Sequence, residues 1–553
     1  MRMFERYTTT GFSSYEDFVK NFKINAPDDF NFAYDVMDVL AEEKPEKLAL
    51  LWTNLEGDVR RFTFADLKRL TDKAANFFYS QGIRKGDMVM LILKRHYEFW
   101  ISILALHKIG AVVIPATHLL MKKDIVYRNN AAQVKAIVCT DKSEVIDHID
   151  ESEPESPSLK CKIVVGKDRP GWVNFTTGVE AASEDWERPA GEEATRLQDP
   201  MLLYFTSGTT GMPKMVMHNY SYALGHIPTA VYWHNVDPDG IHLSVSDSGW
   251  GKCAWGKLYG QWFAETTVFV YDFDKFVPPE LLEVISKFKI TTFCAPPTIY
   301  RYFIKEDLSK YDLSHLKYVT TAGEALNPEV FEQFRQATGL DIKEAFGQTE
   351  TVLALGNFIY MNAKPGSLGK PNPIYDIDVV DENGNPCRTG ESGEIAIRAD
   401  ENTFHIGMFM GYYKDPELTR QAWHDGLYRT GDVAWRDEEG YFWYVGRADD
   451  VIKSSGYRIG PFEVESALME HPAVLETAIT GVPHPVRGQV IKATIVLAPG
   501  YTASEELKKE LQDHVKHTTA PYKYPRVVEF VDELPKTISG KIRRVELRNK
   551  EQK

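Results

Sequence analysis

The sequence has few cysteines, and their spacing suits neither a disulfide framework nor a zinc site. The five in this 553-residue chain are Cys139, Cys161, Cys253, Cys294 and Cys387, and no two form a Cys-x-x-Cys pair. An odd number of widely separated cysteines argues against both kinds of cross-link. We therefore expect single buried thiols in a reducing compartment, and we predict a cytoplasmic protein.

Long apolar runs are also missing. The N-terminal residues 1–6 lead into no apolar stretch, so we predict no signal peptide. The strongest candidate for a membrane span, residues 99–115, is interrupted by His107 and Lys108. A spanning helix needs about 20 predominantly apolar residues, so we predict no membrane span.

The sequence also has no excess of basic residues. Lys and Arg number 64 against 79 Asp and Glu, which gives a formal net charge of -15. Nucleic-acid binding proteins usually carry a basic face, so we predict no nucleic-acid partner. A local basic pocket for a small anion remains compatible with this charge. With 43% hydrophobic and 26% charged residues, the composition is that of a soluble globular protein, and the length indicates more than one domain.

Short apolar runs alternate with amphipathic stretches through the first 350 residues. Residues 88–93, 111–115, 136–139 and 163–165 predict buried strands, and residues 64–79 and 97–108 predict helices, the second ending before Gly110. This alternation is typical of βαβ units and a parallel sheet. Residues 374–398 alternate in polarity around an Asn-Gly turn, which predicts a small antiparallel unit.

The segment from Gly446 to Asp450 marks a boundary in the pattern. After it come predicted helices at 462–469 and 504–514 and predicted strands at 478–482, 493–497 and 527–531. We therefore predict an α/β fold in two domains. Residues 1–447 would form a large domain of two layered α/β subdomains plus a small β unit, and residues 448–553 a small α+β domain.

One loop stands out for its chemistry. It follows a predicted strand at 201–205 and consists of Thr206, Ser207, Gly208, Thr209, Thr210, Gly211, Met212, Pro213 and Lys214. Glycines let the backbone approach a ligand, successive N–H groups can bind an anion, and four hydroxyls with one lysine suit a polyphosphate. It is not a P-loop, because Met215 follows the lysine where that motif needs Ser or Thr. Such a composition is also typical of a plain surface loop.

Two further segments follow predicted strands that would lie side by side. Gly323 and Glu324 end one strand, and residues 344–350 end the next. Ligands of open α/β sheets bind outside the carboxyl ends of the strands. Glu350 beside a phosphate loop would suit Mg²⁺, although a lone glutamate is more often a surface residue. Asp432 follows Thr-Gly and fits either a ribose or a turn cap.

Six segments in order resemble the signatures of the adenylate-forming family, which includes acyl-CoA synthetases, peptide-synthetase adenylation domains and luciferases. They are residues 206–214, 323–325, 346–350, 428–432, 446–449 and 535–541, and the resemblance covers most of the chain. It is greatest to the short- and medium-chain acyl-CoA synthetases. It implies a large domain followed by a small mobile lid. It also implies two half-reactions, in which a carboxylate attacks the α-phosphate of ATP and a thiol then displaces AMP from the acyl-adenylate.

The resemblance implies a role for each matching residue. The terminal phosphates of ATP would be held by Thr206, Ser207, Gly208, Thr209, Thr210, Gly211 and Lys214. The adenine and its surroundings would be bound by Gly323, Glu324, Ala325, Glu344, Ala345, Phe346, Gly347 and Gln348. Thr349 would contact the α-phosphate, Glu350 would hold Mg²⁺, and Asp432 and Arg447 would bind ribose. Asp449 would be the hinge, Ser455, Gly456, Tyr457 and Arg458 would contact CoA, and Lys541 would bridge the carboxylate and ATP. Acetylation, which controls related synthetases, would remove the charge of Lys541.

The identity of the acid needs a separate argument. Acetate-specific relatives carry Trp where this chain has Gly347, so we expect a pocket for more than two carbons. Trp250 and Trp255 lie among glycines and turn residues, and we expect one of them to limit its depth. This favours a short-, medium- or branched-chain acid. One methylene changes discrimination by only about 1–3 kcal/mol, so the pocket sets a range.

Several alternatives stay open. No carrier domain follows the lid before Lys553, which favours CoA over a carrier-bound acceptor. An aryl-CoA ligase would differ only in pocket shape, and a luciferase-like oxidase or an enzyme with a non-CoA acceptor would share the first half-reaction. A non-enzymatic adenylate sensor would lack Glu350 or Lys541, and both are present. The oligomeric state stays open, with a homo-oligomer among the choices.

Overall fold

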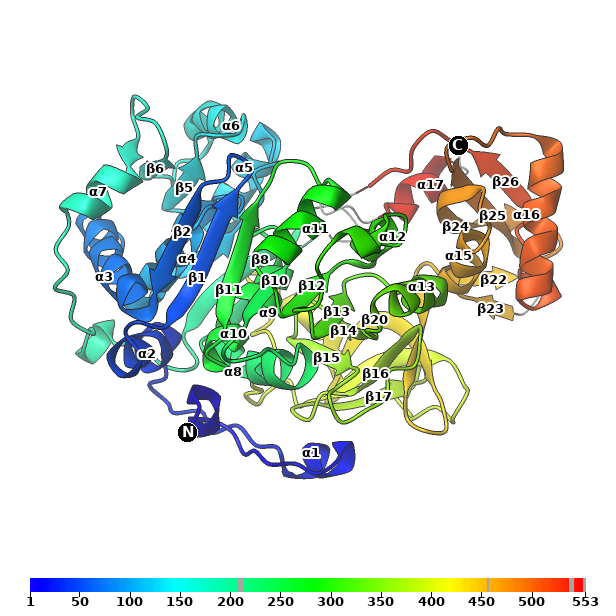
Figure 1. The fold of residues 1–553 in the computed structure, drawn as a ribbon, viewed down its shortest axis with the longest axis horizontal. Helices are drawn as coiled ribbons and strands as arrows, with labels where there is room; N and C mark the ends of the chain where they lie inside the picture. The colour runs from blue at the N-terminus through cyan, green and yellow to red at the C-terminus, as the bar shows by residue number, and fades with distance from the viewer. Residues whose placement is uncertain (207–211, 455–456, 537–541, 551–553) are drawn as a thin grey trace.

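The computed structural model describes residues 1–206, 212–454, 457–536 and 542–550 (Figure 1). They form a mixed α/β body and a small C-terminal domain, shown in orange and red at the right of Figure 1. The predicted fold class is therefore confirmed.

The first subdomain is a parallel sheet with helices on both faces. Its seven strands among the described residues run in the order β7 (Val173–Asn174), β6 (Cys161–Val165), β5 (Ala136–Thr140), β3 (Met88–Ile92), β4 (Val112–Pro115), β8 (Pro200–Thr206) and β9 (Lys214–Asn219). Of the described strand pairs in this sheet, only β8–β9 is antiparallel. Its helices are α3 (Phe64–Ser80), α4 (Glu98–Ile109), α5 (Lys122–Ala132), α6 (Val145–Ser152) and α7 (Phe175–Ala181).

Side-chain alternation along β3 explains why both faces are covered. Met90 and Ile92 join one apolar core with Ile125 of α5, whereas Val89 and Leu91 join another that includes residues of α3 and α4. A strand that buries both faces reads as a continuous apolar run, which is why the sequence predicted it.

The second subdomain contains the longest sheet. Among the described residues its order is β17 (Asp376–Val380), β18 (Gly393–Arg398), β20 (Leu427–Arg436), β21 (Phe442–Arg447), β16 (Ser367–Pro371), β15 (Leu353–Gly356), β14 (Ile342–Gly347), β13 (Tyr318–Ala322), β12 (Thr292–Ala295), β10 (Ile241–Ser244), β11 (Thr267–Asp272), β1 (Leu48–Asn54) and β2 (Val59–Thr63), with β19 (Trp423–His424) beside β20. The stretch from β14 to β1 is parallel. β17 and β18 form the antiparallel unit predicted for residues 374–398, and β20 and β21 extend it.

The helices of this part of the chain are α1 (Tyr15–Asn21), α2 (Val39–Glu43), α8 (Ser221–Pro228), α9 (Gly251–Lys257), α10 (Tyr259–Phe263), α11 (Pro278–Lys287), α12 (Pro297–Phe303), α13 (Pro328–Thr338) and α14 (Pro416–Ala422). The expectation of turn structure around Trp255 is wrong, because Trp255 lies inside α9. Gly256 has a packing role there, since a Cβ atom at this position would lie 2.1 Å from the Ser244 hydroxyl oxygen. The helix therefore needs the small residue that sequence reasoning takes as a sign of a turn.

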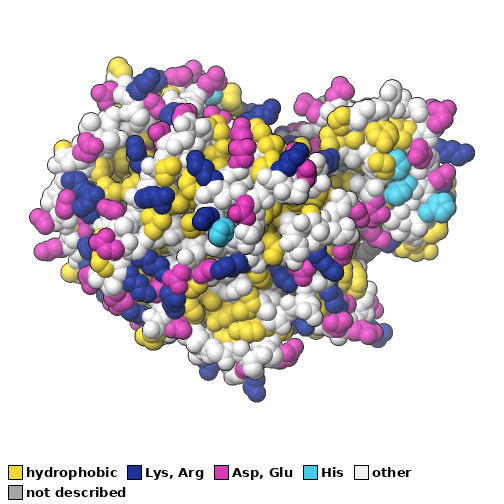
Figure 2. Space-filling model, in the orientation of Figure 1, with side chains coloured by type: hydrophobic (Ala, Val, Ile, Leu, Met, Phe, Trp, Pro, Cys, Tyr) yellow, Lys and Arg dark blue, Asp and Glu magenta, His cyan; other side chains and the backbone are white. Residues whose placement is uncertain are grey.

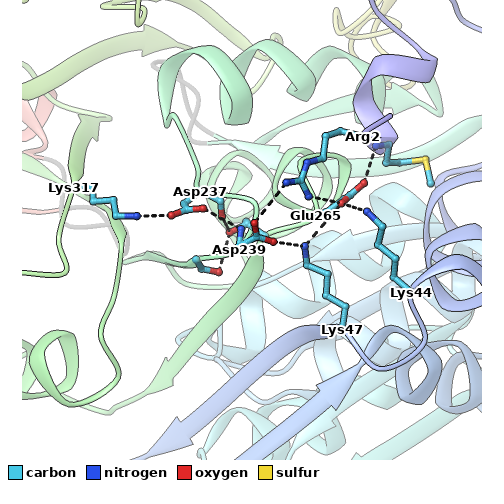
Figure 3. Close-up of polar contacts among 10 residues, drawn as sticks. Arg2, Lys44, Lys47, Asp237, Asp239, Glu265 and Lys317 are labelled. Atoms are coloured by element: carbon cyan, nitrogen blue, oxygen red, sulfur yellow. Dashed lines mark hydrogen bonds and ion pairs between the residues drawn. The ribbon is translucent and has the colours of Figure 1, made fainter.

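An ion cluster fastens the start of the chain to the second subdomain (Figure 3). The Glu265 carboxylate, whose side chain is 1% exposed, pairs with Arg2 at 3.0 Å and with Lys44. Asp239 pairs with Lys47 at 3.2 Å and with Arg2 at 3.6 Å. A buried carboxylate is stable only when it is paired, so this cluster fixes the N-terminal segment in place.

The C-terminal domain has a sheet of its own. Among the described residues it runs β23 (Tyr457–Ile459), β22 (Ile452–Ser454), β25 (Gly488–Leu497) and β24 (Val474–His484), with β26 (Val527–Phe530) on β25. Helices α15 (Pro461–Met469), α16 (Glu505–Thr518) and α17 (Arg544–Lys550) accompany it. Figure 2 shows a hollow between this domain and the larger body, with acidic and basic side chains intermixed over the visible face.

All five cysteines are free thiols, as predicted, but Cys161 and Cys387 are only half buried. Among the described helices, none combines the length and apolar character that crossing a bilayer requires.

Candidate active site

The predicted convergence of strand ends is present at one edge of the longest sheet. β13 and β14 are parallel neighbours, with Thr321 opposite Glu344 and Ala322 opposite Ala345. The segments that follow, Gly323–Ala325 and Gln348–Glu350, therefore leave the sheet at the same edge. Ligands of parallel sheets bind at this edge.

The predicted phosphate loop begins and ends next to this edge. Thr206 and Lys214 face each other across the β8–β9 pair, and Nε2 of His218 in β9 lies 2.6 Å from the Thr349 carbonyl oxygen. Five predicted phosphate contacts, Ser207, Gly208, Thr209, Thr210 and Gly211, lie outside the described residues. The strand that follows the loop, β9, nevertheless lies beside the segment that contains Thr349.

Lys214 and Glu350 share a tyrosine that sequence reasoning missed. The Tyr412 hydroxyl donates a hydrogen bond to Glu350 Oε1 at 2.8 Å, and Lys214 Nζ lies 4.9 Å from the centre of the Tyr412 ring. Glu350 is buried, with 9% of its surface exposed. Tyr412 thus contacts both a buried carboxylate and a lysine next to Thr349.

These residues fit a magnesium ion bound together with phosphates. Tyr412 occupies only one of the two Glu350 carboxylate oxygens. Mg²⁺ is usually bound by one or two carboxylates and completed by phosphate oxygens and water. The described residues form no cluster of three or more His, Cys, Asp or Glu suited to a metal, so the phosphates would have to supply most of the ligands.

Asp432 lies in a dense hydrogen-bond network. Its carboxylate accepts hydrogen bonds from Gln348 Nε2 at 2.5 Å, the Tyr444 hydroxyl at 3.0 Å and Arg447 at 3.0 Å. Asp432 and Arg447 are directly opposite in the β20–β21 pair. The predicted ribose residues are therefore adjacent, and Gln348 ties them to the β14 edge.

Glycine at position 431 makes room for the Arg447 side chain. Gly431 has φ +71°, and a Cβ atom there would approach the Arg447 guanidinium to 2.7 Å. The Thr-Gly-Asp order thus places the aspartate and clears the space above it. On the same side, Tyr428 donates a hydrogen bond to Gln348 Oε1 at 2.7 Å.

In the predicted adenine segment, the space beside Gly323 is open, whereas the Glu324 side chain is held by contacts with α12. Gly323 has φ +104°, and no atom of the described residues lies within 4 Å of a Cβ built there. The Glu324 carboxylate lies 3.3 Å from Thr298 and 3.3 Å from Arg301, both of α12. A planar ring could therefore approach the backbone at Gly323 without steric hindrance.

Glu344, which the sequence analysis placed in this region, has a buried side chain. Its Oε1 accepts a hydrogen bond from the Leu326 amide at 3.0 Å, and Oε2 is buried with no hydrogen-bond partner in the described part of the chain. Burial raises the pKa of Glu344 to about 8. The side chain is therefore neutral at pH 7 and fastens the start of the 326–328 segment.

We expect Glu344→Gln to flatten the dependence of stability on pH. Because the folded-state pKa is raised, the folded protein binds more protons than the unfolded chain between about pH 4.5 and about pH 8. Stability must then fall as pH rises through this window. In thermal melts, the melting temperature of the glutamine variant should rise relative to that of the wild type as the pH increases from 6 to 9. The exposed Glu329→Gln serves as the control, and a parallel decline of Glu344→Gln and wild type would contradict this origin of the slope.

Trp255 covers the space beside Gly347. A Cβ atom at position 347 would lie 2.3 Å from Cη2 of Trp255 and 2.8 Å from the Val352 carbonyl oxygen. The space that the missing side chain leaves is thus occupied by an indole from α9. Trp250, at the start of that helix, is half buried. From the sequence, either tryptophan could limit the depth of the acyl pocket. The contact with Gly347 favours Trp255.

The predicted residues of the C-terminal domain are only partly described. Ser455, Gly456 and Lys541 lie outside the described residues, as does the side chain of Arg458. The Tyr457 ring stacks on Tyr522 of the same domain with 4.1 Å between centroids, and half of Tyr457 is exposed. Asp449, the predicted hinge, lies 3.8 Å from Arg447.

Two residues that the sequence analysis missed complete the site. Tyr428 could have been found, because Tyr428, Thr430 and Asp432 alternate along one strand and so share a face. Tyr412 follows no such pattern, since it lies in the irregular segment before α14. Its role depends on the tertiary contact with Glu350.

Comparisons with known proteins agree with this geometry. Residues 37–413 match the family described as AMP-binding enzyme, and residues 463–541 match the AMP-binding enzyme C-terminal domain. The chain is 43% identical over 556 residues to the acyl-coenzyme A synthetase ACSM3, mitochondrial, of Pongo abelii, covering 99% of this chain and 94% of that protein.

Two solved structures share the fold. The anthranilate CoA ligase AuaEII, in complex with anthranoyl-AMP, has a TM-score of 0.87 at 28% identity, covering 95% of this chain and 98% of that one. The Brucella canis acyl-CoA synthetase has a TM-score of 0.73 at 31% identity, covering 98% and 99%.

The cytoplasmic location predicted from the sequence is contradicted. The orangutan relative and the mouse relatives ACSM3 and ACSM4 carry mitochondrial names. The prediction depended on the cysteines, and free thiols do not distinguish between compartments that are both reducing.

Proposed function

The chain belongs to the AMP-binding enzyme family and is an acyl-CoA synthetase, and from this premise we propose how its residues carry out the reaction. It activates a carboxylic acid with ATP as an acyl-adenylate and transfers the acyl group to CoA, releasing AMP and pyrophosphate. The observation that carries the assignment of residues is the meeting of Lys214, Thr349, Glu350 and Asp432 at one strand edge.

The charges at this edge suit the first half-reaction. A carboxylate and the α-phosphate of ATP are both anionic, so their approach requires preorganised positive charge. Lys214 would contact the terminal phosphates and Thr349 the α-phosphate, while Glu350 would hold Mg²⁺, which would neutralise phosphate charge. Asp432 and Arg447 would orient the ribose, and the open backbone at Gly323 would receive the adenine.

Lys541 would supply the last cation. Support for this role comes from Arg544, three residues further along the chain, which interacts electrostatically with Glu324 and Tyr444 of the large domain. We place the domain boundary between residues 447 and 448. In support, β21 ends at Arg447 in the long sheet, and β22 begins at Ile452 in the sheet of the C-terminal domain.

We assign the acid to the short-, medium- or branched-chain range, with Trp255 as the wall of the acyl pocket. Truncation by Trp255→Leu should raise kcat/KM for pentanoate about 10-fold relative to butanoate, because the one additional methylene is worth about 1–3 kcal/mol. The rate with each acid is measured as acid-dependent AMP release, and thermal melts verify that each variant is folded. Trp250→Leu is the matched variant: if it shifts the range and Trp255→Leu does not, Trp250 is the wall.

An aryl acid is the second candidate. The observation that favours it is the likeness, at TM-score 0.87, to a ligase solved with anthranoyl-AMP. Benzoate in the same assay decides between the two. The mitochondrial names of the relatives support a mitochondrial location for this chain as well.

A further inference from the structure

A row of alternating charges leads from the proposed ribose site to the C-terminal helix. Arg447 pairs with Asp432 at 3.0 Å, and its Nε lies 3.8 Å from Asp449 Oδ1. On the other side of Asp449, Arg548 lies 3.9 Å from Oδ2 and donates a hydrogen bond to the Asp449 carbonyl oxygen at 3.3 Å. Arg548 also pairs with Asp450. The proposed hinge carboxylate is thus held between two guanidinium groups.

The backbone between these charges is a tight turn. The amides of Asp450 and Val451 both donate to the Arg447 carbonyl oxygen, at 3.0 and 3.1 Å, and the Ala448 amide donates to Gly431 at 2.9 Å. The start of the turn is therefore fixed to the β20–β21 pair of the large domain. Its end is held by Arg548, which is 98 residues away from Asp450 in sequence.

Helix α17 is firmly part of the C-terminal domain. Leu547 is buried with Ala478 and Leu534, and Arg544 makes three hydrogen bonds to Glu465 of α15, at 2.7, 2.8 and 3.2 Å. Arg544 and Arg548 are four residues apart and lie on one face of the helix. One end of that face meets the boundary with the large domain near Glu324 and Tyr444, and the other meets the hinge.

We propose that Arg548 is a positioning residue that fixes the orientation of the C-terminal domain for the first half-reaction. The proposal rests on the proposed function, since it assumes two half-reactions and a hinge at Asp449. In the described orientation, Arg544 interacts electrostatically with Glu324 and Tyr444 of the large domain, and β23, with the predicted CoA residue Tyr457, pairs and stacks only within its own domain among the described residues. This arrangement suits acyl-adenylate formation.

The row of charges also connects ligand binding to the hinge. A ribose that donates its hydroxyls to Asp432 competes with Arg447 and Gln348 for the same carboxylate. Arg447 would then interact more strongly with Asp449. Binding of the nucleotide thereby changes how strongly Arg447 interacts with Asp449 compared with Arg548. A ligand can change the domain orientation only if its contacts differ between the two orientations, and this change supplies such a difference.

The test separates the two half-reactions in Arg548→Gln. We expect acyl-adenylate formation, followed as pyrophosphate release, to fall about 5- to 10-fold, while thioester formation from supplied acyl-adenylate and CoA stays within about twofold of the wild type. Arg548→Lys should recover most of the loss, because it keeps the charge. Arg543→Gln is the control, since Arg543 pairs only with neighbouring Glu546 among the described residues and should change neither rate.

A second readout does not depend on activity. The amides of Asp450 and Val451 should exchange hydrogen faster in Arg548→Gln than in the wild type, with melting temperatures alike. Equal loss in both half-reactions, or unchanged rates and exchange, would overturn the proposal. A wild type that releases no pyrophosphate with any acid would instead refute the proposed function, and the exchange result would still decide whether Arg548 holds the hinge.

Discussion

Lys541→Ala removes acyl-adenylate formation and spares the second half-reaction. A cation at the transition state that joins two anions typically contributes a factor of about 10²–10³, and we expect at least this loss in pyrophosphate release. Thioester formation from supplied acyl-adenylate and CoA should remain within about threefold of the wild type, because that step brings no carboxylate to ATP.

Lys536→Ala is the matched control for this variant. Lys536 lies five residues earlier and pairs with Glu476 of its own domain at 2.8 Å. Removal of an exposed pair of this kind changes stability by about 1 kcal/mol or less and should leave both half-reactions intact. Equal losses in both half-reactions of Lys541→Ala would reject the division of labour between the two domains.

Glu350→Gln should lower acyl-adenylate formation by about 10²–10³ and raise the Mg²⁺ concentration needed for half-maximal rate. The amide keeps the shape of the side chain, and its oxygen can still accept the hydrogen bond from Tyr412. The substitution therefore removes the negative charge while preserving the packing. Loss of charge stabilisation by a metal ion costs several kcal/mol at the transition state.

Tyr412→Phe distinguishes the charge of Glu350 from its orientation. This variant keeps the carboxylate and deletes the hydrogen bond at 2.8 Å, so its rate should fall less, by about 10-fold, with the Mg²⁺ requirement nearly unchanged. A Mg²⁺ requirement that is identical in wild type and Glu350→Gln would show that this glutamate does not hold the ion.

Local patterns in the sequence were sufficient to predict the strands and the order of the site. β3 is an apolar run, β13 is a short strand that ends at Gly323 and Glu324, and the Thr-Gly order before Asp432 indicates a turn. Such features depend on residues that are neighbours in sequence. At these positions the prediction from sequence therefore agrees with the structure.

Contacts between distant segments could not be predicted in this way. Tyr412 meets Glu350 across 62 residues, and Arg548 meets Asp449 across 99, with no periodicity to reveal either pairing. Helix α9 was missed for a related reason. Gly256 indicates a turn by propensity, but the close approach of Ser244 requires it in a helix. Tertiary packing overrides local preference at such positions.

The central claim is that this site activates a carboxylic acid of limited size and transfers it to CoA. The most direct test measures acid- and CoA-dependent release of AMP and pyrophosphate over acids from acetate to dodecanoate, with 2-methyl-branched acids and benzoate included. We predict thioester formation with a maximum between about three and eight carbons, set by the wall at Trp255. A maximum at acetate alone, or pyrophosphate release without any CoA thioester, would contradict this account.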